Sequence, residues 1–184
     1  MRVEALAIPD VKLITPKKFG DERGFFSETW NERVLAEAGI TARFVQDNQA
    51  HSGTQGTLRG MHFQLAPMVQ DKLVRVTRGA ILDVAVDIRA KSPTFGRHVS
   101  AVLSAENWTQ IWVPKGFAHG YCTLEADTEV FYKVTEYYSP AHDRGILWDD
   151  PALGIAWPVT RAMAQLSDKD KMQPKLADVM TNAF

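Results

Sequence analysis

Cysteine, long apolar runs and an excess of charge of either sign are all scarce in this chain of 184 residues. Its single cysteine, Cys122, cannot form an internal disulfide, and the amino-terminal residues lack the continuous apolar segment of a signal peptide or a membrane span. The formal net charge of -1 gives no basic surface for nucleic acid. We therefore expect a cytoplasmic protein that binds neither nucleic acid nor membranes.

Internal repeats, low-complexity tracts and linkers are also absent from the sequence. With 45% apolar and 23% charged residues, the chain has ample material for a core, so the sequence predicts a single domain over residues 1–184. Cys122 stands between Tyr121 and Thr123 in an apolar stretch. It is therefore predicted to be a small core residue rather than a nucleophile.

The clearest helix runs from about Asn31 to Ala38, with Asn31 as its N-cap and Gly39 as its stop. Most of the remaining sequence alternates with period two and is interrupted by glycine, proline or aspartate. This pattern is typical of a β-sandwich or a β-barrel. The sequence therefore predicts a mainly β protein.

Two stretches show the strand alternation most clearly. Residues 80–89 place Leu82, Val84, Val86 and Ile88 on one face and Ile81, Asp83, Ala85, Asp87 and Arg89 on the other. This predicts a strand with one apolar side and one polar side. Residues 129–138 place Tyr132 and Tyr138 on one face about 20 Å apart, at roughly 3.3 Å per residue, so they could touch two ends of one long ligand.

His62 is the first candidate for chemistry, because it shares a predicted strand face with Gln64 just after Gly60, which allows close backbone or ligand approach. A lone histidine in a strand is more often a structural residue. Here three cations are expected in the same hairpin: Arg59, Lys72 and Arg75. Such a cluster suits an anionic substrate and a developing oxyanion.

Two further motifs have both a structural and a functional interpretation. Pro114–Gly120 is a turn that delivers His119 to the next strand, where the histidine either faces a ligand or only caps the strand. Ser167–Asp170 fits the S-x-x-D helix-capping pattern before a short C-terminal helix. The pattern alone favours the capping role for Asp170.

Taken together, motifs from about Phe19 to Asp170 closely resemble the dTDP-4-dehydrorhamnose 3,5-epimerase family in order and spacing. The motifs are Asp21–Glu28, Gln46–Asn48, Thr57–Gln64, Lys72–Val76, Asp83–Arg89, Ser92–Gly96, Pro114–Gly120, Tyr132–Lys133, Gly145–Pro151 and Leu166–Asp170. The resemblance implies a cupin-type jelly-roll barrel with a few short flanking helices. It also implies a homodimer that acts on a dTDP-linked 4-keto-6-deoxy sugar in dTDP-L-rhamnose biosynthesis.

The resemblance further implies roles for individual residues. His62 matches the catalytic base, Asp170 the carboxylate that orients it, Tyr132 the proton donor and Lys72 the cation near the C4 oxygen of the sugar. The substrate-binding positions are Arg23, Glu28, Gln46, Asn48, Arg59, His119 and Tyr138, of which Tyr138 would stack on thymine. Asp83 is the expected partner of His119, and Asp143 and Lys169 are left out because they lie in less regular segments.

The chemistry that this implies needs no cofactor. The protons at C3 and C5 both flank the C4 ketone, so removal of either gives an enolate with its charge on the same oxygen. A histidine near neutral pKa can take the proton from one face, and a tyrosine can return a proton to the other. An ammonium group such as that of Lys72 would stabilise the enolate.

Three alternatives stay open beside this reading. Many jelly-roll cupins bind a metal through two histidines one residue apart, but Gln64 stands at the second position here, so we expect no metal. Relatives within the fold could invert only C3 or only C5, because the same base and acid serve either outcome. A non-catalytic sugar-nucleotide-binding cupin would need the cations and Tyr138 but not the catalytic groups.

Overall fold

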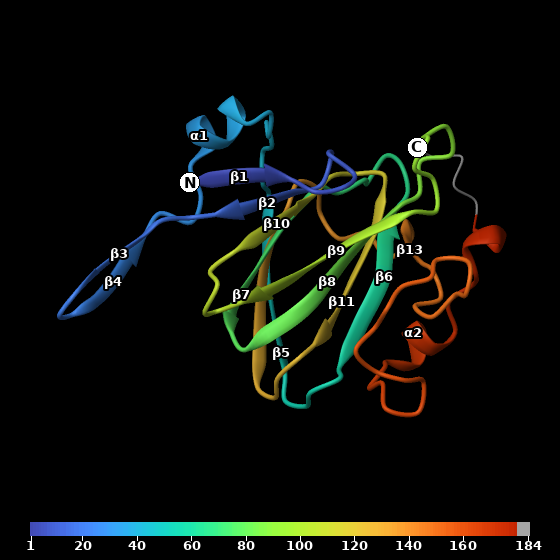
Figure 1. Ribbon diagram of the computed structural model, residues 1–184. Coiled ribbons are helices and arrows are strands. Elements are labelled where there is room, and N and C mark those ends of the chain that lie inside the picture. The colour runs from blue at the N-terminus through green and yellow to red at the C-terminus, as the bar shows by residue number, and fades with distance from the viewer. Residues whose placement is uncertain (180–184) are drawn as a thin grey trace.

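The computed structural model describes residues 1–179 and has two antiparallel sheets that face each other (Figure 1). The six-stranded sheet has the order β1 (Arg2–Ala5), β2 (Lys12–Thr15), β10 (Gln110–Val113), β7 (Lys72–Arg78), β12 (Thr128–Val134), β5 (Gln46–Ser52). The five-stranded sheet has the order β13 (Asp143–Gly145), β6 (Leu58–Gln64), β11 (Phe117–Thr123), β8 (Ala80–Asp87), β9 (His98–Ser104). The predicted mainly β jelly roll is confirmed. The predicted domain extends to Phe184, and residues 180–184 lie outside the described residues.

The helices are short, as expected: α1 (Glu32–Glu37), α2 (Asp168–Lys171) and the 3₁₀ helix η1 (Leu176–Asp178). In α1 the side chain of Asn31 accepts a hydrogen bond from Val34 N at 3.2 Å, which confirms the predicted cap. Leu35 is fully buried and fixes the helix to the barrel. Within residues 1–179 no helix combines the length and the apolar character needed to cross a membrane.

Both faces of β8 are buried, although their alternation is as predicted. Ile81 and Ala85 face the second sheet and pack in the core between the sheets. Leu82 and Val84 face outward and pack under the C-terminal part of the chain. The polar side of this strand therefore lies inside the barrel, where its aspartates are shielded from bulk water.

The predicted hairpin of Arg59, Lys72 and Arg75 is wrong, because β6 and β7 lie in different sheets. The intervening loop crosses between the sheets and is held by Gln64, whose Nε2 donates to Met68 O at 2.6 Å. Arg75 lies on the outward face of β7, over the Phe131 ring at 5.1 Å. Arg59 and Lys72 instead project from opposite sheets into the barrel interior.

The strand predicted for residues 129–138 also ends early, at Val134. The two neighbouring strands extend no further in that direction, because Val134 pairs with the first residue of β5 on one side and with the first residue of β7 on the other. Without a partner on either side, the chain leaves the sheet. Tyr138 therefore lies in the following loop, and the prediction that it shares a strand face with Tyr132 is wrong.

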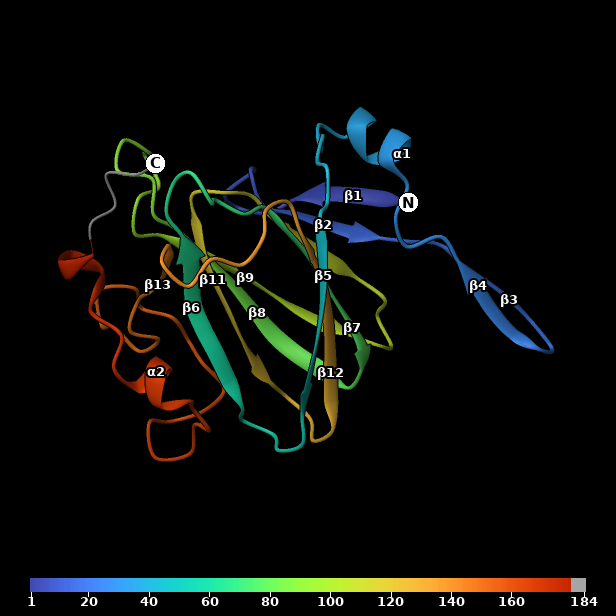
Figure 2. The same cartoon turned by 180° about the vertical axis from the view of Figure 1, so that it is seen from behind.

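A two-stranded arm, β3 (Lys18–Asp21) and β4 (Gly24–Ser27), projects away from the barrel (Figures 1 and 2). Its base is fixed by Trp108, whose Nε1 donates to Ser27 Oγ at 2.9 Å. Beyond the base the arm exposes large apolar side chains: Phe19, Phe25 and Phe26 are 53%, 55% and 70% exposed. Three exposed phenylalanines on one small hairpin are typical of a surface that another molecule covers.

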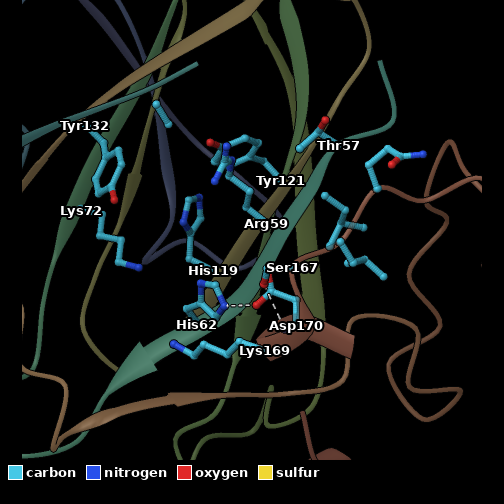
Figure 3. Close-up of a pocket in the computed structure, with 14 residues that line it drawn as sticks. Thr57, Arg59, His62, Lys72, His119, Tyr121, Tyr132, Ser167, Lys169 and Asp170 are labelled. Atoms are coloured by element: carbon cyan, nitrogen blue, oxygen red, sulfur yellow. Dashed lines mark hydrogen bonds and ion pairs between the residues drawn. The ribbon is translucent and has the colours of Figure 1, made fainter. Parts of the chain in front are cut away.

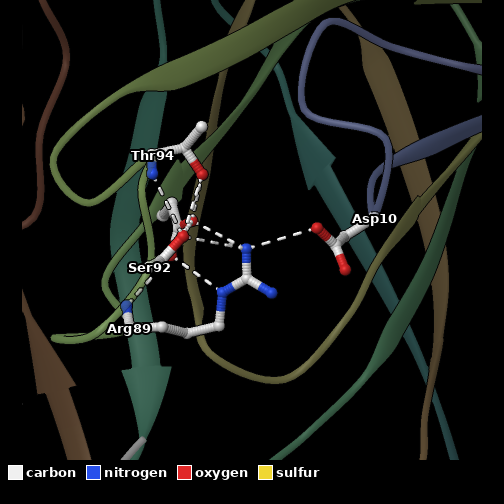
Figure 4. A network of polar contacts seen from close by, with 5 residues as sticks. Asp10, Arg89, Ser92 and Thr94 are labelled. Atoms are coloured by element: carbon white, nitrogen blue, oxygen red, sulfur yellow. Dashed lines mark hydrogen bonds and ion pairs between the residues drawn. The ribbon is translucent and has the colours of Figure 1, made fainter.

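A polar network closes the loop after β8 (Figure 4). The carboxylate of Asp87 is fully buried and accepts hydrogen bonds from Arg89 Nη2 at 2.7 Å, Ser92 Oγ at 2.6 Å and Thr94 Oγ1 at 2.5 Å. Burial alone would raise the pKa of Asp87, but these hydrogen bonds prevail and lower it to about 2. Asp87 therefore stays charged and anchors the loop.

Candidate active site

A cavity of about 510 Å³ opens between the two sheets (Figure 3). The strands alternate, so apolar residues fill one part of the barrel interior and polar residues line the remainder. The cavity is lined by Ala50, Thr57, Leu58, Arg59, His62, Lys72, His119, Tyr121, Tyr132, Gln165, Leu166, Ser167, Lys169 and Asp170. Six of the predicted site residues are in this lining: His62, Lys72, Tyr132, Asp170, Arg59 and His119.

His62 and Asp170 form a hydrogen-bonded pair on one wall of the cavity, with Nε2 and Oδ1 2.6 Å apart. His62 is on β6 and Asp170 on α2, which packs against that strand. Burial would raise the pKa of Asp170, but the bond to His62 prevails and lowers it. An ionised Asp170 fixes the imidazole, leaving the other ring nitrogen to accept a proton.

The capping interpretation of Ser167–Asp170 is confirmed as well. Ser167 Oγ accepts a hydrogen bond from Asp170 N at 3.1 Å and caps α2. The backbone of Asp170 thus serves the cap while its side chain serves His62. Asp170 therefore takes part both in the helix cap and in the contact to His62.

Tyr132 and Lys72 approach the same cavity from the opposite sheet, on neighbouring strands β12 and β7. Burial raises the pKa of Tyr132, so its hydroxyl keeps its proton at neutral pH. Burial also lowers the pKa of Lys72 to about 8, against the attraction of Asp143 and Asp83. The cavity therefore holds a protonated phenol and an ammonium group opposite the histidine.

Arg59 and His62 both face the cavity although they are three residues apart on β6. Regular alternation would put them on opposite faces, but the pairing of β6 with β11 shifts register between His119 and Tyr121. The strands approach closely there: a Cβ on Gly60 would lie 2.5 Å from the Cα of Gly120. The close approach predicted for Gly60 is confirmed for the backbone.

His119 lies beside His62 in the paired strands and is held by Asp83, with Nε2 at 2.8 Å and 3.0 Å from the two carboxylate oxygens. The partner predicted for His119 is therefore in place. Of the two sequence interpretations, the structure supports the cavity-facing one, since His119 lines the cavity and is only 7% exposed.

An adjoining cavity of about 300 Å³ also includes His62, Lys72 and Tyr132 in its lining. Three further predicted site residues, Gln46, Asn48 and Tyr138, line the same cavity. Asp143 and Lys169, which the sequence analysis left out, line it too. They form an ion pair, and Asp143 Oδ2 accepts a hydrogen bond from Tyr138 Oη at 3.0 Å. Lys169 lies within the Leu166–Asp170 motif, whereas Asp143 lies in none of the motifs, and the irregular segments around both residues gave no face assignment.

Two predicted binding residues lie away from both cavities. Arg23 is at the tip of the β3–β4 arm, where it bonds Asp21 of the same arm and is 84% exposed. Glu28 lies just after the arm and accepts a hydrogen bond from Asn31 Nδ2 at 3.0 Å. Within one chain the structure does not bring these two side chains to the site.

The side chains around the cavity do not gather as metal ligands do. His62 and His119 are each bound to their own carboxylate, and Gln64 makes loop contacts. Among residues 1–179 no group of three or more His, Cys, Asp or Glu could hold a metal ion. Cys122 is fully buried, and burial raises the pKa of its thiol to about 11, in line with a core role.

The arrangement is suited to proton transfer at a carbon next to a carbonyl group. A carboxylate-oriented imidazole on one sheet can remove a proton, a protonated tyrosine on the other sheet can supply one, and an ammonium group lies beside them. Because the imidazole and the tyrosine lie on opposite walls, a proton can be removed from one face of a flat intermediate and another proton added to its opposite face.

Known proteins provide an independent comparison. Residues 5–178 match the family model described as dTDP-4-dehydrorhamnose 3,5-epimerase. The protein of that name from Sinorhizobium fredii is 55% identical over 179 residues, which cover 97% of this chain and 91% of the relative.

Solved structures agree with the sequence match. The dTDP-4-dehydrorhamnose 3,5-epimerase of Bacillus anthracis, solved with TDP and PPi bound, superimposes with a TM-score of 0.91 at 52% identity, covering 95% of this chain and 98% of that one. The dTDP-6-deoxy-D-glucose-3,5-epimerase of Legionella pneumophila, in complex with dTDP-4-keto-L-rhamnose, gives a TM-score of 0.93 at 45% identity, covering 99% and 96%.

Proposed function

This chain belongs to the dTDP-4-dehydrorhamnose 3,5-epimerase family, and we propose that it inverts C3 and C5 of dTDP-4-keto-6-deoxyglucose in dTDP-L-rhamnose biosynthesis. One observation carries this proposal. His62, bonded to Asp170 of α2, projects from one sheet, and Tyr132 and Lys72 project from the other sheet into the same cavity. Epimerisation needs a base and an acid on the two faces of one sugar ring.

In this proposal His62 removes the proton from the carbon next to the C4 ketone, and Asp170 stabilises the imidazolium that forms. The negative charge moves onto the C4 oxygen, where Lys72 donates a hydrogen bond. Tyr132 then delivers its proton to the opposite face of the same carbon. His62 then loses its extra proton to solvent, and Tyr132 regains one from solvent. Because C3 and C5 both flank that ketone, the same groups can then serve the second inversion without a metal or cofactor.

Substrate binding is assigned to the surrounding side chains. Tyr138 is 56% exposed and lies in the adjoining cavity, where its ring is available to stack on thymine. Gln46 and Asn48 line the same region, Arg59 provides charge for the diphosphate, and His119 contacts the sugar. Asp143 and Lys169 join this group by position.

We further propose that the enzyme works as a cytoplasmic homodimer. Arg23 and Glu28 match substrate-binding motifs but lie on or beside the arm, away from their own cavity. The arm also carries the exposed Phe19, Phe25 and Phe26. Both features fit an arm that covers part of a second copy and brings Arg23 to that copy's substrate.

Proton NMR of the reaction in deuterated water tests the activity. Incubation with dTDP-4-keto-6-deoxyglucose should exchange the protons at C3 and C5 for deuterium and invert both centres. Exchange and inversion at one carbon alone would identify a mono-epimerase. Binding without any exchange would instead identify a non-catalytic sugar-nucleotide-binding protein.

The Tyr132→Phe variant tests the assigned acid. The change removes one hydroxyl and leaves the ring, so fold and nucleotide binding should persist. Net epimerisation should fall by about 10²-fold or more, whereas proton abstraction by His62 should continue as slow deuterium exchange. Unchanged product formation by this variant would contradict the role of Tyr132.

A further inference from the structure

Tyr121 is a buried residue of the cavity wall that the proposed reaction does not use. It lies on β11, paired with Arg59 of β6 on one side and with Asp83 of β8 on the other. Its side chain lines the cavity, next to Arg59 in Figure 3, and its ring centroid is 6.5 Å from that of His119. Tyr121 is only 5% exposed.

The hydroxyl of Tyr121 has no hydrogen-bond partner. Within residues 1–179, its Oη is the only buried side-chain nitrogen or oxygen that lacks a hydrogen-bond partner. Burying a hydroxyl without a partner is unfavourable, and phenylalanine would fill nearly the same volume without that penalty. An unpaired polar atom in the wall of a binding cavity is explained most simply by a partner that arrives with the ligand.

The surroundings of the hydroxyl define that partner. Burial raises the pKa of Tyr121, so the group remains a hydrogen-bond donor. Both carboxylate oxygens of Asp83 are engaged by His119, and the guanidinium of Arg59 has donors only. The missing group is therefore an acceptor oxygen, and a partial or full negative charge on it would also suit Arg59.

Arg59 also provides a way for the ligand to reach this hydroxyl. Its guanidinium is held by two long hydrogen bonds, from Nη2 to His51 O at 3.2 Å and from Nε to Ser52 Oγ at 3.4 Å. These bonds are weak enough to be exchanged for contacts to an anion. A shift of Arg59 towards a bound anion would uncover its neighbour Tyr121.

We infer that Tyr121 is a substrate-binding residue whose hydroxyl donates a hydrogen bond, beside Arg59, to an acceptor oxygen of the bound nucleotide sugar. The inference rests on the proposed function, and it adds a contact to the same site. The oxygen belongs either to the diphosphate or to the sugar, and the two sources are separated by the choice of ligand.

The test is isothermal titration calorimetry of the Tyr121→Phe enzyme with dTDP and with dTDP-6-deoxyglucose. The second ligand has a hydroxyl in place of the C4 ketone, so it cannot form the enolate and binding is measured without turnover. We expect the dissociation constant of the variant for the sugar nucleotide to rise by about tenfold. The melting temperature of the unliganded variant should be equal to or above that of the wild type, because an unpaired hydroxyl has been removed.

Tyr137→Phe, at an exposed position outside both cavities, is the matched control and should change neither the dissociation constant nor the melting temperature.

Each outcome has one meaning. Weaker binding of both ligands supports a diphosphate oxygen as the acceptor, and weaker binding of dTDP-6-deoxyglucose alone supports a sugar oxygen. Unchanged affinity for both ligands, with or without a rise in melting temperature, overturns the inference. If the wild-type enzyme binds neither ligand, the proposed function fails, and this inference fails with it.

Discussion

At the scale of single residues, Lys72 shows how burial and catalysis are linked. Its pKa of about 8 is well below that of an exposed lysine, because the ammonium group is desolvated inside the barrel. Only the protonated form can stabilise an enolate oxygen. The lysine is thus still charged at neutral pH, but its pKa lies only about one unit above that pH.

This pKa sets an upper pH limit for the reaction. Lys72 is a cation below about pH 8 and loses its charge above it, so kcat/KM should fall by up to about tenfold per pH unit on the alkaline side. In Lys72→Arg the charge persists, so we expect a lower rate but no alkaline decline near this pH. The pH dependence of kcat/KM, which reports groups of the free enzyme, checks this, with Lys115→Arg, an exposed position outside the cavity, as the control. The same decline in Lys72→Arg and wild type would assign the titration to another group.

Which residues act together was only partly predictable from the sequence. Asp170 follows His62 by 108 residues, so no local pattern could pair them, and the family resemblance was needed. The capping pattern of Ser167 was local and was found directly. Tyr121 gave no signal, because an unpaired hydroxyl is visible only when its neighbours are placed.

At the scale of elements, patterns within one strand or helix were reliable and pairings between elements were not. The cap at Asn31 and the alternation in β8 depend on neighbours in sequence, and both are present. The direction in which β8 turns its polar side depends on the C-terminal segment that covers its apolar side. Likewise, the end of β12 depends on where β5 and β7 stop.

The loop after β8 gives a test of stability at this scale. The folded pKa of Asp87, about 2, is below its unfolded value of about 4. The carboxylate therefore contributes stability above about pH 4, and about 2 kcal/mol of it is lost as the pH falls from 4 to 2. Asp87→Asn should destabilise the protein by about 3 kcal/mol at neutral pH and remove this part of the acid dependence.

Urea unfolding between about pH 2 and 7 measures both effects. The control is Asp10→Asn, since Asp10 bonds the same Arg89 at 3.3 Å but is 48% exposed. A half-exposed ion pair contributes less than about 1 kcal/mol. Equal losses from the two substitutions would show that burial of Asp87 is not what makes its network strong.

At the scale of the whole molecule, the arm decides whether one chain forms a complete site. Its motif residue Arg23 lies at the tip of the arm, and Phe19, Phe25 and Phe26 of the arm are each more than half exposed. The sequence located the motif, but only the fold shows that it is separate from the cavity. The proposed homodimer resolves this separation.

Mixing two inactive variants tests that arrangement. In a hybrid dimer of His62→Asn and Arg23→Ala chains, one site would carry both defects and the other would carry neither if the arm acts on the partner. Unfolding and refolding an equal mixture should then restore about a quarter of the wild-type activity, measured with dTDP-4-keto-6-deoxyglucose. Each variant refolded alone should stay inactive. If Arg23 served its own cavity, no hybrid site would be intact and no activity would return.

The outward apolar face of β8 also has a consequence for how the protein is made. Its cover includes Leu153 and Leu176, which are synthesised long after Leu82 and Val84. During synthesis this apolar surface stays exposed to water until residues 153–176 have left the ribosome. Asp170, the carboxylate bonded to His62, belongs to the same segment. The nascent barrel therefore gains the cover of its apolar face and the partner of His62 in one late step.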